Sequence, residues 1–202
     1  MSAAAILQRS AYAPDARVAF QGERGAYGDL AIQRIWGSQA QRVEQPDFAS
    51  VVRAVAAGDA DYAVLPVHNV ITGPVTWARA VLAGTSLTVE GHVEIAVRHC
   101  VLGVPGARLE GIRRVLSHMV ALGQCTRFIA ERRLIAVPHY DTAGAARDVA
   151  LGARASDAAI ASEECAERYG LVVLERDVSD RSDNATRFVV LSRPRERGLL
   201  RA

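Results

Sequence analysis

The sequence predicts an α/β fold with two α/β lobes around a cleft, and three features support it. Short apolar runs typical of strands alternate with segments whose apolar residues recur at helical spacing, which favours mostly parallel sheets covered by helices on both faces. An extended stretch at 86–104 is suited to cross between lobes, and a late strand at 186–192 can return to the first one. We therefore expect lobe 1 at about 17–93 plus 180–194, and lobe 2 at about 94–179.

In the first lobe, β-like apolar runs separated by glycine turns mark the strands, and apolar spacing of three and four residues marks the helices. The expected strands lie at 18–20 and 62–67, and the expected helices begin near 27, at 48 and after 74. Asp47 is a good N-cap for the second of these helices, and Gly58 ends it. The unbroken apolar run at 62–67 indicates a strand that is buried on both faces.

The second lobe repeats the alternation after the extended crossing. The expected strands lie at 114–116, 134–137, 158–161 and 171–174, with helices at 120–131, 141–151 and 163–169. Gly170 ends the last of these helices, and the final strand at 188–191 follows. We expect residues 1–16 to be a disordered leader and 195–202 to be a frayed tail.

Composition excludes several classes of protein. The 202 residues carry 24 basic side chains, all of them arginine, against 22 acidic ones, which is too even a balance for a protein that tracks nucleic-acid phosphates. No run approaches the roughly 18 apolar residues that a membrane span needs. Three scattered cysteines suggest neither a disulfide framework nor a zinc site, so we expect a cytoplasmic protein without nucleic-acid or membrane partners.

Short polar side chains follow three buried strands where the next helix begins, namely Asn69, Ser117 with His118, and Ser162. In open α/β sheets, ligands bind at such junctions because helix N-termini present free N–H groups. The pattern favours a cleft for a small anion, although Ser117 and Ser162 alone are also explained as N-caps. The histidines show no metal-ligand spacing, and His68 and His118 are kept as possible site residues because they lie at strand ends.

The string DNATRF at 183–188 leads polar groups directly into a buried strand. Thr186 offers a hydroxyl that can donate or accept a proton, and Arg187 could bind a carboxylate through two hydrogen bonds. The competing interpretation is an asparagine turn followed by a surface arginine. No GxSxG, P-loop or GxGxxG motif occurs, so acyl-enzyme and nucleotide chemistry have no support.

Together these strings resemble the catalytic domain of the prephenate dehydratase family, which includes the plant arogenate dehydratases. The resemblance runs over 17–194 and rests on DNATRF and on several further strings in the family's order. These are GDADY at 58–62, LPV at 65–67, SH at 117–118 with AL at 121–122 and QC at 124–125, DTAGAA at 141–146, AIAS at 159–162 and YGL at 169–171.

The resemblance implies a fold like the type II periplasmic binding proteins, with the active site in the cleft. It implies a lyase that converts prephenate to phenylpyruvate, with loss of carbon dioxide and water, in phenylalanine biosynthesis. Thr186 would assist departure of the hydroxyl group. The implied substrate-binding residues are Asn69, Ser117, Gln124, Thr142, Ser162, Arg187 and Phe188. The resemblance implies no metal or organic cofactor, and a homodimer or homotetramer.

Two departures from the family pattern leave alternatives open. The family's Glu-Asn-Ser is replaced by His68, Asn69 and Val70, and the chain stops soon after the last predicted strand, so we expect no ACT regulatory domain. The alternatives are an arogenate dehydratase, a prephenate decarboxylase that does not aromatise the ring, and a non-catalytic module that binds small anions.

Overall fold

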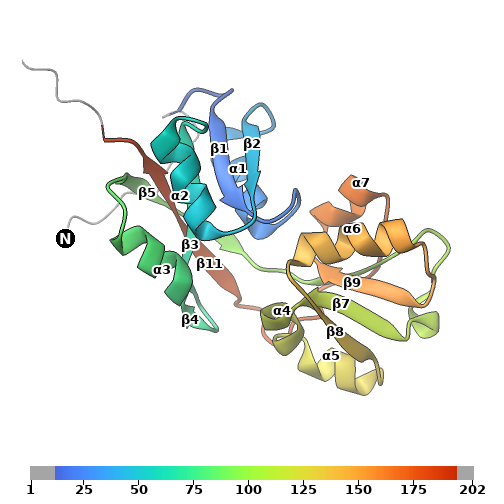
Figure 1. Cartoon of the computed structure of the whole chain (residues 1–202). Coiled ribbons are helices and arrows are strands. Elements are labelled where there is room, and N and C mark those ends of the chain that lie inside the picture. The colour runs from blue at the N-terminus through green and yellow to red at the C-terminus, as the bar shows by residue number, and fades with distance from the viewer. Residues whose placement is uncertain (1–11, 195–202) are drawn as a thin grey trace, which may run out of the picture.

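The structure, a computed structural model, describes residues 12–194, which form two α/β lobes (Figure 1). The strands of the first lobe are β1 (Arg17–Gln21), β2 (Gln41–Gln45), β3 (Tyr62–Asn69), β4 (Gly73–Pro74), β5 (Thr88–Ala96) and β11 (Ala185–Ser192), and its helices are α1 (Tyr27–Trp36), α2 (Phe48–Ala57) and α3 (Thr76–Ala83). They form a six-stranded sheet in the order β2-β1-β3-β11-β5, with β4 paired to β3.

The second lobe contains a five-stranded sheet in a similar setting of helices (Figure 1). Its strands are β6 (Cys100–Gly103), β7 (Arg114–His118), β8 (Ile135–His139), β9 (Asp157–Ala161) and β10 (Val172–Glu175), and its helices are α4 (Met119–Gly123), α5 (Thr126–Glu131), α6 (Thr142–Gly152) and α7 (Glu164–Tyr169). The strand order is β10-β6-β9-β7-β8. The two sheets, each packed with helices, confirm the predicted α/β fold class.

The chain crosses between the lobes twice, first between β5 and β6 and then between β10 and β11. The second crossing returns β11 to the first sheet, where it lies between β3 and β5 and is antiparallel to both. Two short connections therefore join the lobes, and each brings residues to the boundary between them.

Both faces of the first sheet are covered, as the unbroken apolar runs predict. On β1, Val18 and Phe20 pack with α1, while the intervening Ala19 packs with Val51 and Val55 of α2. This alternation follows from the strand geometry, which turns successive side chains to opposite faces. The second sheet is covered in the same way, with α6 on one face and α4 on the other.

The predicted helix at 120–131 is wrong as a single element, because it is divided into α4 and α5. The carboxylate of Asp180 accepts hydrogen bonds from the backbone N–H groups of Thr126 and Arg127, each at 3.0 Å, and so caps a new helix start. Asp180 is distant in sequence, so local spacing could not indicate the break. Gln124 is thereby the C-cap of α4 rather than a residue inside a longer helix.

Strand β2 was not predicted because its sequence, QRVEQ, is mostly polar. Part of the predicted leader is ordered: the Tyr12 ring packs against Trp36 and Tyr62, with ring centroids 4.9 and 5.0 Å apart, and Ala16 is buried in the core. Residues 1–11 of that leader and the predicted tail lie outside the described residues.

Among the helices at 12–194, none is long and apolar enough to cross a bilayer.

A loop of the first lobe, the 22–26 loop, docks onto the second lobe. The Gly25 carbonyl accepts a hydrogen bond from Ser162 Oγ at 2.7 Å, and the Arg24 carbonyl accepts one from Tyr169 at 2.6 Å. Gly25 has φ 91°, and a Cβ there would lie 2.8 Å from Cys165 Sγ, so only glycine permits this close approach. The loop holds the lobes together along one side of the space between them.

Candidate active site

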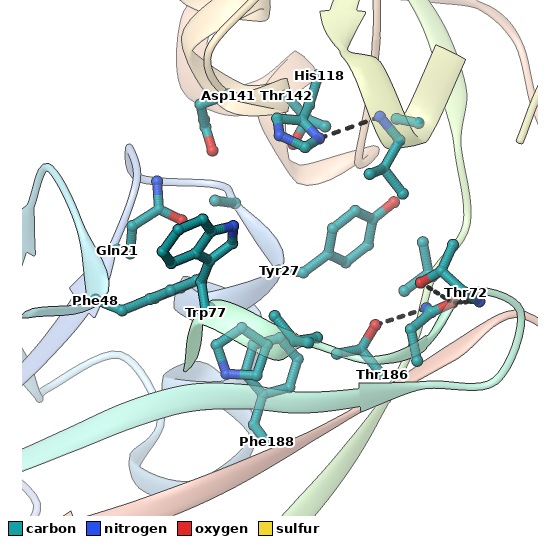
Figure 2. Close-up of a pocket in the computed structure, with 18 of the residues that line it drawn as sticks. Gln21, Tyr27, Phe48, Thr72, Trp77, His118, Asp141, Thr142, Thr186 and Phe188 are labelled. Carbon is teal, nitrogen blue, oxygen red and sulfur yellow. Dashed lines mark hydrogen bonds between the residues drawn. The ribbon is translucent and has the colours of Figure 1, made fainter. Parts of the chain in front are cut away.

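A cavity of about 790 Å³ lies between the lobes, within the size range of small-molecule sites. Figure 2 shows side chains of the first lobe facing side chains of the second across it. The lining includes Gln21, Tyr27, Phe48, Asn69, Thr72, Trp77, Thr186 and Phe188 from the first lobe, and His118, Gln124, Tyr140, Asp141 and Thr142 from the second.

Thr186 and Asn69 come together because they are direct cross-strand partners on β11 and β3. The register between these strands shifts at Arg187 and Phe188, where β3 contains one extra residue. This bulge re-aims the end of β3. Without it, the alternation from Pro66 would carry His68 to the cavity face, whereas with it Asn69 lines the cavity.

The side chain of Asn69 has a fixed direction. Its Oδ1 accepts hydrogen bonds from the backbone N–H groups of Ile71 at 2.9 Å and Thr72 at 3.0 Å, and backbone nitrogen can only donate. Asn69 Nδ2 is therefore the donor that lies 2.9 Å from Thr186 Oγ1. Since the Thr186 oxygen accepts this hydrogen bond, its own proton remains to be donated into the cavity.

The second lobe contributes the N-terminus of α6. Asp141 is its N-cap and accepts a hydrogen bond from the Gly144 N–H at 2.8 Å, and Thr142 is the first helical residue. Burial raises the pKa of the Asp141 carboxyl above its ordinary value, against the lowering effect of the helix N–H groups. His118 caps α4, with its Nδ1 3.3 Å from the Val120 N–H (Figure 2).

Six of the predicted site residues line this cavity, namely Asn69, His118, Gln124, Thr142, Thr186 and Phe188. Two of the predicted serines are buried outside the lining, each with its hydroxyl bonded to a carbonyl. Ser117 Oγ donates to Ile160 O at 2.5 Å, which ties β7 to β9, and Ser162 Oγ donates to Gly25 O in the 22–26 loop. Both serines thus stabilise the packing of elements next to the cavity.

Arg187 and His68 are also outside the lining. They are cross-strand partners, and both are exposed on the face of the sheet opposite to Thr186 and Asn69. The Arg187 guanidinium pairs with Glu94 of β5 at 2.6 Å. Because Thr186 and Arg187 are neighbours on one strand, they cannot both point into the cavity.

Sequence reasoning missed several lining residues, including Tyr27, Trp77 and His99. Trp77 is 81% exposed. In the sequence, a tryptophan on the helix expected after 74, close to Asn69, is a signal that could have been used. His99 was not among the histidines kept as possible site residues, but it is buried at the first crossing and lines the cavity. In the described part of the chain, no three His, Cys, Asp or Glu side chains are placed to hold a metal ion.

The family follows from comparison with known proteins. Residues 18–196 match the family model described as prephenate dehydratase. The chain belongs to the prephenate dehydratase family. Arogenate dehydratase/prephenate dehydratase 2 of Arabidopsis thaliana is 39% identical over 177 residues, covering 88% of this chain and 46% of that protein. The bifunctional N-acyl-homoserine lactone acylase/prephenate dehydratase of Komagataeibacter europaeus is 40% identical over 179 residues, covering 87% and 62%. This chain thus spans about half to three fifths of the length of these relatives.

Solved structures agree with this assignment. The prephenate dehydratase of Arthrobacter aurescens in complex with L-Phe matches with a TM-score of 0.80 and 29% identity, over 88% of this chain and 60% of that one. A nutrient-binding protein from Burkholderia cenocepacia bound to methionine matches with a TM-score of 0.50 and 14% identity, over 88% and 84%. The second match shows only the fold, which is that expected for the prephenate dehydratase family.

Proposed function

We propose that this chain is a prephenate dehydratase, a lyase that converts prephenate to phenylpyruvate, carbon dioxide and water in phenylalanine biosynthesis. The observation that carries the proposal is the Thr186 hydroxyl. It lines the cavity, and because it accepts the hydrogen bond from Asn69 Nδ2, its O–H is the group free to donate to a leaving oxygen. Membership of the family supports the same reaction.

The reaction breaks the C4–O bond of prephenate and the bond between C1 and its carboxylate. The electron pair of the second bond enters the ring, the carboxylate leaves as carbon dioxide, and the hydroxyl leaves as water after gaining one proton that solvent ultimately supplies. A threonine hydroxyl is too weak an acid to transfer its proton fully. Thr186 therefore acts by a hydrogen bond that strengthens as negative charge grows on the leaving oxygen.

The start of helix α1 supports binding of a carboxylate. Ala26, Tyr27 and Gly28 line the cavity, and the N-cap Ala26 provides no side chain to satisfy the first N–H groups. Free N–H groups at a helix N-terminus bind anions, and the helix dipole adds to the attraction. Over residues 12–194, no arginine side chain belongs to the lining, so the backbone and amide N–H groups there are suited to bind a substrate carboxylate.

Apolar side chains form much of the remaining wall, including Phe48, Trp77, Val81 and Phe188. The ring carboxylate of the substrate loses its charge as carbon dioxide departs. A wall without a cationic partner stabilises the neutral product more than the charged carboxylate, so it favours this step.

Arogenate is a second candidate substrate, and the carboxylates in the lining favour it. Arogenate carries an ammonium group where prephenate has a keto group. Asp141 and Asp47 both line the cavity, and either carboxylate is complementary to an ammonium group. Several plant relatives are named arogenate dehydratases.

We do not extend the acylase activity in the name of the Komagataeibacter relative to this chain. Covalent acyl transfer needs a nucleophile hydrogen-bonded to a base. Among the described residues, the hydroxyls of Thr186 and Thr72 hydrogen-bond to Asn69, and the third cavity threonine, Thr142, has no hydrogen bond to a histidine.

The test is to incubate the purified chain separately with prephenate and arogenate at neutral pH and to identify the products by ultraviolet absorbance and mass. Phenylpyruvate from prephenate supports the main proposal, and phenylalanine from arogenate supports the second. A product that keeps a non-aromatic ring would instead indicate a decarboxylase, and turnover of neither substrate would refute both proposals. Arg187→Gln serves as the control variant, since Arg187 points away from the cavity.

We further propose that the chain acts as a homodimer or homotetramer in the cytoplasm. The three cysteines, all buried and free, support a reducing compartment. Light scattering measures the oligomer, and fractionation of cells measures the location; a monomer or an extracellular protein would refute the respective proposal.

A further inference from the structure

We propose that His99 is a positioning residue for the reaction, because its Nε2 proton holds the Gln124 end of a chain of three buried amides whose other end contacts Thr186. The inference rests on the proposed function for its role in turnover. Its structural part, the protonation of one ring nitrogen, can be tested without any substrate.

The chain of amides is continuous. Asn69 Nδ2 lies 2.8 Å from Asn184 Oδ1, and Asn184 Nδ2 lies 2.9 Å from Gln124 Oε1. Gln124 Oε1 also lies 3.1 Å from His99 Nε2. All four side chains are buried, and His99 is 2% exposed. A polar group in such surroundings must find a partner of opposite kind or lose considerable stability.

The direction of the hydrogen bonds along these three amides is set at the Asn69 end. The backbone N–H groups of Ile71 and Thr72 hold the Asn69 oxygen, so the Asn69 nitrogen must donate to Asn184. The Asn184 oxygen is then the acceptor, and its nitrogen must donate to Gln124. Turning any one amide over would bring two donors or two acceptors together at its contact. His99 Nε2 faces the Gln124 oxygen and must therefore carry a proton.

The other ring nitrogen of His99 meets a group that can either donate or accept. Tyr27 OH donates to the Arg98 carbonyl at 2.7 Å and lies 3.0 Å from Nδ1, so an unprotonated Nδ1 shares the single Tyr27 proton with that carbonyl. Burial lowers the pKa of His99, which favours the neutral ring at neutral pH. The neutral ring with its proton on Nε2 is the form that the amide chain requires.

This direction matters at the cavity because Gln124 lines it. The Gln124 oxygen is held by two donors, while its amide nitrogen has no hydrogen-bond partner among the described residues. Gln124 thus presents N–H groups to an anionic substrate, and Asn69 keeps its N–H on the Thr186 oxygen. Without the Nε2 proton, the Gln124 oxygen would keep only the Asn184 donor, and one hydrogen bond instead of two would hold the amide in this orientation.

The row of hydrogen-bonded amides with His99 also connects the two crossings between the lobes. His99 lies in the first crossing, Asn184 lies just before β11 in the second, and Gln124 belongs to the second lobe. Thr186 and Asn69 belong to the first lobe. The donors of both lobes are therefore aligned through contacts at the boundary itself.

The first experiment measures ¹⁵N chemical shifts of the histidine rings in the labelled protein at neutral pH, with His99 assigned by its loss in a variant. We expect the proton on Nε2 and an unprotonated Nδ1. A neutral ring protonated on Nδ1 would overturn the assignment, whether or not the protein turns over prephenate.

The second experiment compares His99→Gln with His99→Met, two side chains of the same length. Glutamine can donate an N–H near the position of Nε2, and methionine cannot. We expect His99→Met to lower kcat/KM roughly 10- to 100-fold, the size of a lost hydrogen bond to a buried group, and His99→Gln to recover most of that loss. Thermal melts of both variants confirm folding. Equal losses in two folded variants would overturn the positioning role, and if His99→Met does not fold, a His99→Gln activity as low as that of Gln124→Leu would do the same.

Discussion

Replacing Thr186 by valine tests the chemistry of the cavity most directly. Valine has nearly the same shape as threonine, and Thr186 is buried, so the substitution removes one hydroxyl with little change in packing. Asn69 Nδ2 keeps two acceptors, Asn184 Oδ1 at 2.8 Å and the Ala185 carbonyl at 3.1 Å. Both of its protons therefore remain bonded, and no buried donor is orphaned.

The expected effects on stability and on rate differ widely because of this arrangement. Loss of one hydrogen bond without an orphaned partner costs about 1 kcal/mol, which lowers the Tm of a chain of this size by roughly 2–4 °C. A donor that stabilises a developing negative charge contributes about 2.7–4 kcal/mol, so kcat should fall about 10²- to 10³-fold. KM should change little, since the interaction strengthens in the transition state.

The assay follows phenylpyruvate formation from prephenate by Thr186→Val, with Thr186→Ser as the matched variant that keeps the hydroxyl. We expect the serine variant to retain a kcat within about tenfold of the parent chain, because it loses only the methyl group. A folded valine variant with unchanged kcat would refute the role of the hydroxyl. A large rise in KM alone would show that Thr186 only binds substrate.

Three further predictions concern stability. The Arg42 side chain, 3% exposed, pairs with Asp29 at 2.8 Å and donates to three backbone carbonyls, so Arg42→Met should lower the free energy of unfolding by about 3–5 kcal/mol in urea titrations; a loss below 1 kcal/mol would contradict this. Ser162→Ala should lower the Tm by leaving the Gly25 carbonyl with only the weak Cys165 thiol donor at 3.5 Å, whereas an unchanged Tm would mean that the 22–26 loop is held by its other contacts. The hydrogen bonds from Arg17 hold the pKa of Asp61 below its ordinary value, so this pair stabilises the fold above about pH 4, and the stabilisation is lost as pH falls through the lowered pKa. Acid titration of Asp61→Asn should show a weaker decrease in stability below that pH, and an identical profile would exclude the pair as a cause.

The sequence predicted the two lobes and many of their elements because alternating apolar patterns report burial on sheet and helix faces. It also predicted Asn69 and Thr186, which the structure places together in the cavity. Local pattern could not show which way neighbouring side chains point, so Thr186 and Arg187 were grouped although they face opposite sides of β11. The bulge in β3 decides that Asn69 rather than His68 lines the cavity, and it depends on pairing with a strand more than one hundred residues away.

The contacts of His99 could not be predicted from the sequence for a similar reason. Its role depends on Gln124, Asn184 and Tyr27, three residues that come together only where both crossings meet. None of these contacts is local in sequence, and a lone histidine after an extended stretch has no distinctive pattern. Long-range pairing, which periodicity does not encode, is therefore what sequence reasoning lacked at this site.

The position of β11 has a consequence for how the protein is made. Because β11 lies between β3 and β5, the first sheet remains split during synthesis until residues 185–192 leave the ribosome. The second lobe is a continuous stretch from β6 to β10 and has all its strands earlier. We expect it to fold first, while the first lobe must wait for a strand that closes contacts over long sequence separations, a slow step for any β-sheet. The same strand carries Thr186, so the fold and the cavity hydroxyl that we propose acts on the substrate are completed in one event, and a chain cut short before β11 has neither.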